Sequence, residues 1–157
     1  MRRDGGCFYL VAADWDSEDD DPREGIIATY PDGPTYFQVA RELLVLAGQD
    51  VLAARLKTIN ERTYNRSVVH FDGRDMDELL TVLGELEPAV RAALTDSDGL
   101  IPEDQVDKIR ARSEWLNLAP ARGATARYAV LEALGSVGGL ERILGEARQR
   151  GLVVAID

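Results

Sequence analysis

A short apolar run near the start of the chain constrains the fold more than any other feature. Residues Cys7–Ala13 read CFYLVAA, with two glycines before them and an acidic stretch, 14–24, after them. Seven residues are too few for a typical helix, and an apolar run without polar alternation is typical of a strand that is buried on both faces. We therefore predict a central strand over residues 6–14.

Three later segments have the composition of partner strands. They are 25–30 (GIIATY), 67–71 (SVVHF) and 152–156 (LVVAI). Each is short, rich in β-branched or aromatic residues, and bounded by Gly, Asp or Pro. The chain therefore predicts a sheet of about four strands, with 25–30 antiparallel to the first strand across the acidic stretch.

Apolar residues that recur every three or four positions predict five or six helical segments between these strands. The boundary signals are Thr35 and Asp50 as N-caps, Asp75 with Glu78 as a capping box, a kink or split at Pro88, a break at Gly135 and Gly138-Gly139, and a helix end at Gly151. Along the chain, strands and helices neither alternate strictly nor fall into one block of strands and one block of helices. This order favours an α+β two-layer sandwich. The length of 157 residues suits a single domain over 1–157.

The charge of the chain is unevenly distributed. Residues 1–106 hold 22 acidic and 10 basic side chains, whereas residues 107–157 hold 6 acidic and 8 basic ones, which together give the formal net charge of −10. A negative field repels nucleic-acid phosphates and anionic membranes and attracts basic partners. We therefore expect no nucleic-acid or membrane partner, and we expect a basic protein partner.

The cysteine content and the hydropathy bear on location. Cys7 is the single cysteine, so it has no internal disulfide partner, and its apolar strand predicts a small buried thiol. No window holds eighteen consecutive apolar residues, and the first residues lack the longer apolar segment of a signal peptide. These features predict a cytoplasmic protein.

The acidic stretch 14–24 is the leading candidate for a binding site. It contains seven acidic residues and one arginine. The acidic side chains repel one another, which predicts an extended, mobile loop. A tryptophan among charges is a typical binding anchor, although packing of this ring on the sheet edge is the alternative. The predicted partner-binding residues are Trp15, Asp16, Glu18, Asp19, Asp20 and Asp21.

His70 defines the alternative, enzymatic hypothesis. It is the only histidine, and Asp72, Arg74 and Asp75 follow it closely, so this cluster is the one place suited to proton transfer near neutral pH. A structural role for a histidine at a strand end is the competing interpretation. The sequence contains no nucleophile elbow, phosphate-binding loop, dinucleotide fingerprint or zinc-spaced ligand set, so we assign no catalytic residue and no cofactor.

A short acidic turn bears on metal binding. Residues 96–101 (DSDGLI) resemble the middle of an EF-hand calcium loop. That alignment places Leu94 and Gln105 where the first carboxylate and the bidentate glutamate are needed. We therefore predict no metal ligands, and we expect an Asp-rich turn that caps the next helix.

Three functions compete at this point. The first is a non-enzymatic acidic binding protein with a basic partner; bacterial immunity or inhibitor proteins that block basic toxin domains share this profile in composition, not in motif. The second is a small enzyme that uses His70 and Asp72, or carboxylates at the sheet end. The third is a structural or assembly subunit that forms a homo-oligomer. The absence of catalytic motifs favours the binding protein.

Overall fold

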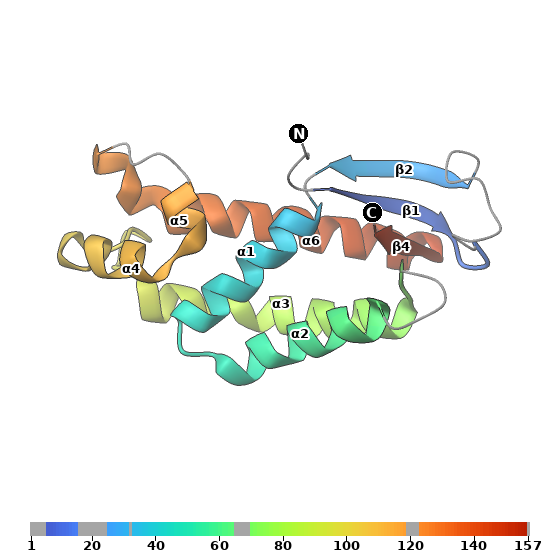
Figure 1. Cartoon of the computed structure of the whole chain (residues 1–157), viewed down its shortest axis with the longest axis horizontal. Helices are drawn as coiled ribbons and strands as arrows, with labels where there is room; N and C mark the ends of the chain where they lie inside the picture. Colours follow the sequence, from blue (N-terminus) through green and yellow to red (C-terminus); the bar gives the residue numbers. More distant parts are fainter. Residues whose placement is uncertain (1–5, 16–24, 32, 65–69, 119–122, 157) are drawn as a thin grey trace.

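The computed structural model describes residues 6–15, 25–31, 33–64, 70–118 and 123–156. Within these ranges the chain forms six α-helices and one four-stranded antiparallel sheet. In Figure 1 the sheet lies on one side of the helical layer, and the small helices α4 and α5 lie at the end away from it. The predicted α+β arrangement of helices over a sheet is therefore confirmed.

The sheet has the order β2-β1-β4-β3. Its strands are β1 (Cys7–Ala12), β2 (Ile26–Pro31), β3 (His70–Phe71) and β4 (Leu152–Ile156). The first and last strands of the chain are thus the two central ones, and β1 pairs antiparallel with both β2 and β4. Of the strand predicted at 67–71, only His70–Phe71 belongs to β3, and 67–69 lie outside the described ranges.

The helical layer is built mainly from four long helices. The helices are α1 (Gly33–Leu46), α2 (Asp50–Tyr64), α3 (Gly73–Leu94), α4 (Val106–Arg112), α5 (Glu114–Leu118) and α6 (Ala129–Arg150), with 3₁₀ turns at η1 (Glu103–Gln105) and η2 (Gly123–Tyr128). Figure 1 shows α6 running along the length of the layer until it leads into β4. None of the helices in the described ranges is both long and apolar enough to cross a membrane.

The two faces of the sheet bury different side chains. The face toward the helices carries Phe8, Leu10, Phe71 and Val154, and the rings of Phe8 and Phe71 meet edge to face with centroids 6.0 Å apart. The opposite face holds a smaller apolar cluster. It contains Val11, Val153 and Ala155, with Tyr9, Trp15 and Ile26 packed against them. This second cluster explains why the sequence of β1 is apolar at nearly every position.

Helix starts differ from their predicted positions at three places. Asp50, predicted as an N-cap, is instead the first residue of α2. Helix α1 begins at Gly33, so Thr35 lies in its first turn and is not its N-cap. At α3 the capping box is formed by Asp72 and Asp75: Asp75 N donates to Asp72 Oδ1 (2.9 Å), and Asp72 N donates to Asp75 Oδ2 (3.2 Å). The predicted box of Asp75 with Glu78 is therefore wrong by three residues, because Asp72 caps the helix directly after β3.

Helices α3 and α6 are longer than their sequences predict. Pro88 lies inside the unbroken 22-residue α3, and Gly135, Gly138 and Gly139 lie inside the unbroken 22-residue α6. An internal proline costs about 3 kcal/mol and each glycine about 1 kcal/mol relative to alanine. Both helices bury a long apolar stripe in the core, and this tertiary packing outweighs those local costs.

Two further expectations concern Gly151 and Cys7. Gly151 ends α6 in the left-handed conformation (φ 66°), which glycine adopts without strain, and β4 starts at the next residue, as predicted. Cys7 is a free thiol, but it is only half-buried because it stands at the first position of β1. The expectation of a buried thiol is thus wrong.

Candidate functional site

The structure describes the two ends of the acidic stretch. Trp15 follows β1 and is fixed by a turn in which its backbone N–H donates to the carbonyl of Ala12 (3.0 Å). Gly25 stands immediately before β2, and its Cα faces the Trp15 ring so closely that an added Cβ would overlap the ring at Cδ1. The two ends of segment 16–24 are therefore held together by the contact between Trp15 and Gly25.

The predicted partner-binding residues divide into two groups. Trp15 is half-buried and packs against the outer face of the sheet, which is the alternative role considered for it. Asp16, Glu18, Asp19, Asp20 and Asp21 lie outside the described residues, and their role in binding stays a prediction. The structure places the residues on either side of them, Trp15 and Gly25, at one end of the β1–β2 pair.

Replacement of Gly25 by valine is expected to expose the Trp15 ring. A valine side chain cannot share the space that the indole occupies, so the ring must leave the sheet. In a Trp115→Phe background, where Trp15 is the single tryptophan, its fluorescence emission should shift to longer wavelength. The control is Ile27→Val, an exposed residue of the adjoining strand β2, which should leave the emission unchanged. An unshifted Gly25→Val spectrum would contradict the packing of Trp15 on Gly25.

The residues of the enzymatic hypothesis have separate positions. His70 pairs with Ala155 of β4 and so lies in the row of the outer sheet face, whereas Phe71 pairs with Val154 and faces the helices. Asp72 is the N-cap of α3. The structure thus gives Asp72 a capping role at the start of α3.

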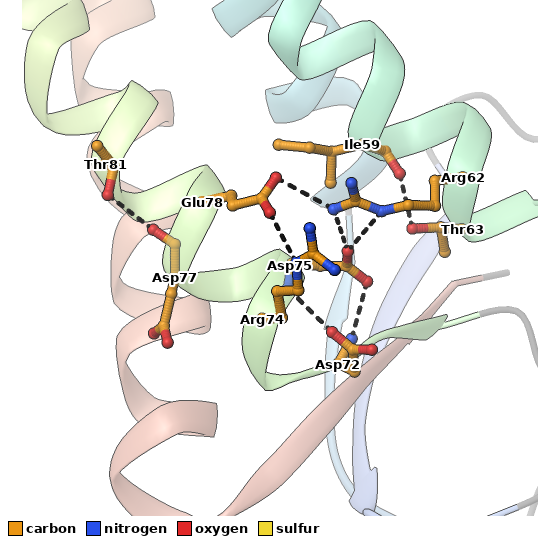
Figure 2. A network of polar contacts seen from close by, with 9 residues as sticks. All are labelled: Ile59, Arg62, Thr63, Asp72, Arg74, Asp75, Asp77, Glu78 and Thr81. Carbon is orange, nitrogen blue, oxygen red and sulfur yellow. Dashed lines mark hydrogen bonds and ion pairs between the residues drawn. The ribbon is translucent and has the colours of Figure 1, made fainter.

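Asp75 is the most deeply buried carboxylate of this cluster (Figure 2). It has no exposed surface, and Arg62 of α2 donates to its Oδ1 through Nη2 (2.6 Å) and Nε (3.2 Å). The same Nη2 also donates to Glu78 Oε2 (3.1 Å), and Arg74 Nε donates to Glu78 Oε1 (3.1 Å). The carboxylates therefore tie α2 to the first turns of α3.

The pKa shifts in this network match that structural role. The hydrogen bond that Arg62 donates to Asp75, followed by the one it donates to Glu78, raises the pKa of Arg62 above its usual value. The hydrogen bond from Arg62 outweighs partial burial and lowers the pKa of Glu78. Both shifts hold the groups in their charged forms near neutral pH, which suits an ion pair and is the opposite of what a general acid requires. Sequence reasoning missed Arg62 because its partners become neighbours only when α2 packs on α3.

The acidic turn at 96–101 is also organised by hydrogen bonds within the protein. Asp96 Oδ1 accepts from the backbone N–H of Asp98 (2.9 Å) and of Leu100 (3.2 Å), and its Oδ2 accepts from Arg127 Nη2 (3.0 Å). Burial opposes ionisation of Asp96, but these donors outweigh it and lower the pKa. The turn is tied to Arg127. It does not cap η1, the next helical turn, because the N-cap position of η1 is Pro102 and no side chain makes a capping hydrogen bond there. Across the described ranges, no three His, Cys, Asp or Glu side chains are grouped to hold a metal ion.

A groove between α3 and α6 contains a carboxyl group that the sequence did not single out. It has a volume of about 450 Å³, and burial, with the nearby charge of Glu87, raises the pKa of Glu141 in its wall. Glu87 itself accepts from Arg91 Nε (3.0 Å). The remaining lining residues are Leu83, Gly84 and Pro88, so no histidine or nucleophile accompanies Glu141 in this groove. A raised pKa without such a neighbour is weak support for an enzyme.

Comparisons with known proteins add no assignment to these sites. Neither the scan against models of protein families nor the searches of curated proteins and of solved structures found a significant match to this chain.

Proposed function

We propose that this protein is a non-enzymatic binding protein that recognises a basic protein surface through its acidic segment 14–24. One observation supports this proposal most: the packing of Trp15 on Gly25 joins the two ends of that segment at the tip of the paired strands β1 and β2. The segment carries seven acidic residues and one arginine, a formal charge of −6 out of the total of −10. More than half of the net charge is thereby attached at one point of the fold.

The physical consequence is a localised negative field. Carboxylates gathered in eleven residues repel one another, and a basic surface relieves that repulsion when it binds. Charge of this kind steers encounter, so it raises the association rate and makes that rate fall with added salt. The binding site in this proposal comprises Asp16, Glu18, Asp19, Asp20 and Asp21, and Trp15, the second residue of the segment, fixes its base on the sheet.

The biological role proposed with this site is that of an inhibitor. An acidic α+β protein that covers a basic partner is the arrangement that bacterial immunity proteins use against basic toxin domains, and the likeness is one of composition. The single Cys7 and the absence of a membrane-crossing helix among the described residues accord with the cytoplasmic location proposed for such a protein.

The proposal predicts that neutralising the segment weakens binding selectively. The segment-neutralised variant replaces Asp16, Asp19, Asp20 and Asp21 by Asn and Glu18 by Gln. Affinity capture from lysate of the native host, quantified by mass spectrometry, should recover a basic protein with the wild type and lose it with this variant. With the purified partner at low salt, the association rate of the variant should fall by about tenfold or more.

A matched variant tests whether position or total charge matters. It neutralises five exposed acidic residues on the helical layer, namely Glu85, Glu103, Asp104, Asp107 and Glu132, and so has the same net charge of −5. We expect it to capture the same partner and to associate at a rate close to that of the wild type. The proposal would be contradicted if the segment-neutralised variant captured as much partner as the wild type, or if both variants lost the partner equally.

A further inference from the structure

A pocket lies where the end of β2 meets α1 and α6. Its volume is about 370 Å³, which is within the range of small-molecule sites. It is lined by Tyr30, Pro31, Tyr36, Gly139, Arg142, Ile143 and Glu146. Aromatic, aliphatic and charged side chains from three elements therefore meet in one hollow.

The carboxylate of this pocket is fully engaged by the protein. Glu146 Oε2 accepts a short hydrogen bond from the hydroxyl of Tyr30, and Glu146 Oε1 accepts from Arg150 Nη1 (2.9 Å). The hydrogen bond from Tyr30, and then that from Arg150, lowers the pKa of Glu146, so this group stays ionised and its charge is offset by Arg150. The Tyr30 ring is held in the pocket wall as a result.

Arg142 is the cation that this arrangement leaves available. It precedes Glu146 by four residues on α6, which is the spacing of a helical ion pair. Glu146 is already occupied by Tyr30 and Arg150, and no carboxylate in the described part of the chain forms an ion pair with Arg142. The exposed guanidinium therefore lines the pocket, and no carboxylate of the described residues occupies its hydrogen-bond donors.

Gly139 brings the cation and an aromatic wall together. A Cβ added at Gly139 would lie 3.6 Å from Arg142 Nη2 and 3.6 Å from Cε2 of Tyr36. The guanidinium and the Tyr36 ring thus approach each other above a helix position that has no side chain. A ligand seated there meets a planar donor group on one side and an aromatic ring on the other.

We propose that this pocket binds a small aromatic carboxylate. The carboxylate matches the paired N–H donors of Arg142, and the aromatic body packs on Tyr36 and on the buried Ile143. A single available cation suits a monoanion. A phosphate dianion would bring a second negative charge beside Glu146 with no second available cation in the pocket lining. The site is independent of segment 14–24 and of the function proposed for it.

Titration with benzoate, followed by ¹⁵N-resolved NMR at physiological salt, tests the ligand class. Benzoate should shift the backbone amides of Gly139, Arg142 and Ile143 in a saturable way, whereas neutral benzamide and ring-free acetate should bind at least about tenfold more weakly. Arg142→Gln, a change at an exposed side chain, should weaken benzoate by about tenfold or more. Equal binding of benzoate and benzamide, an unaffected Arg142→Gln variant, or no saturable shift at these amides would overturn the proposal.

A pair of adjacent glycines provides a matched test of the place. Gly139→Leu puts a side chain into the pocket, whereas a Cβ at Gly138 has no neighbouring atom within 4 Å. Leucine favours a helix more than glycine does, so both variants should unfold at or above the wild-type temperature. We expect Gly139→Leu to abolish the benzoate shifts and Gly138→Leu to retain them. Retention by both variants would overturn the assignment of the pocket.

Discussion

Removal of residues 152–157 is expected to abolish cooperative folding. These residues contain β4, which pairs with β1 on one side and with β3 on the other. The deletion removes three buried side chains, Val153, Val154 and Ala155, and burying each valine stabilises a protein by roughly 1.5–3 kcal/mol. It also leaves two strands without their ladder partner. The combined loss approaches the whole stability of a typical domain, roughly 5–15 kcal/mol, so thermal and urea unfolding followed by circular dichroism should show no cooperative transition.

The substitution Val154→Ala separates the packing of β4 from its pairing. It keeps the backbone ladder and removes only the side chain that packs with Leu10 and Phe71 on the helix-facing side of the sheet. We expect a cooperative transition with a loss of roughly 2 kcal/mol. A truncated chain that still unfolds cooperatively, with a stability close to that of Val154→Ala, would contradict a central position for β4.

The sheet was predictable from the sequence because its strands differ sharply from their surroundings. Segment 7–12 is apolar at consecutive positions, so both faces of the strand carry apolar side chains, and each face of β1 contacts an apolar cluster. Gly151 marks the junction of α6 and β4 through a backbone conformation that favours glycine. Signals of this kind are local, so they need no knowledge of the tertiary fold.

Predictions of helix interruption were wrong where local cost and tertiary packing conflict. Pro88 and Gly138 lower the intrinsic helix propensity, yet their helices continue, because residues on both sides, such as Leu86 and Val90 of α3, are buried in one core. The position of a capping box is also ambiguous where several acids lie close together, as they do at 72–78. Asp72 and Asp75 are both good caps, and the end of β3 decides between them.

The candidate sites were predictable only in part. The concentration of charge at 14–24 is visible in the sequence, but the role of Gly25 in holding Trp15 is not, because it depends on the pairing of β1 with β2. Arg62 and Arg142 each stand among many exposed cations in the sequence. Arg62 becomes the partner of a buried carboxylate when α2 packs on α3, and Arg142 becomes a pocket cation when α6 meets β2 and α1, which lie far from it in the chain.

Among single substitutions of partly exposed side chains, replacement of Arg62 by methionine is expected to destabilise the protein most. It removes the guanidinium that donates twice to Asp75, a carboxylate with no exposed surface that also completes the capping box of α3. Breaking a buried ion pair by removing one partner typically costs about 3–5 kcal/mol, because the other charge stays buried. Urea unfolding should report that loss in the free energy of unfolding.

The matched control is Arg74→Met, which removes an exposed arginine whose ion pair among the described residues is with Glu78. An exposed pair contributes up to about 1 kcal/mol, so this variant should unfold close to the wild type. The double variant Arg62→Met, Asp75→Asn should recover part of the loss, since the amide oxygen accepts from Asp72 N without a buried charge. If Arg62→Met costs no more than Arg74→Met, the buried pair contributes nothing specific to stability.

The pH dependence of stability supplies an independent measure of the same contact. Arg62 lowers the pKa of Glu78 in the folded state, so the unfolded chain binds this proton more readily. The stability that Glu78 contributes is therefore present above the ordinary carboxyl pKa and is lost as the pH falls through the lowered, folded value. Without Arg62 the largest cause of that shift is gone, and the fall in stability on the acid side attributable to Glu78 should be smaller in Arg62→Met than in Arg74→Met. Equal acid-side slopes in the two variants would show that Arg62 does not set the ionisation of Glu78.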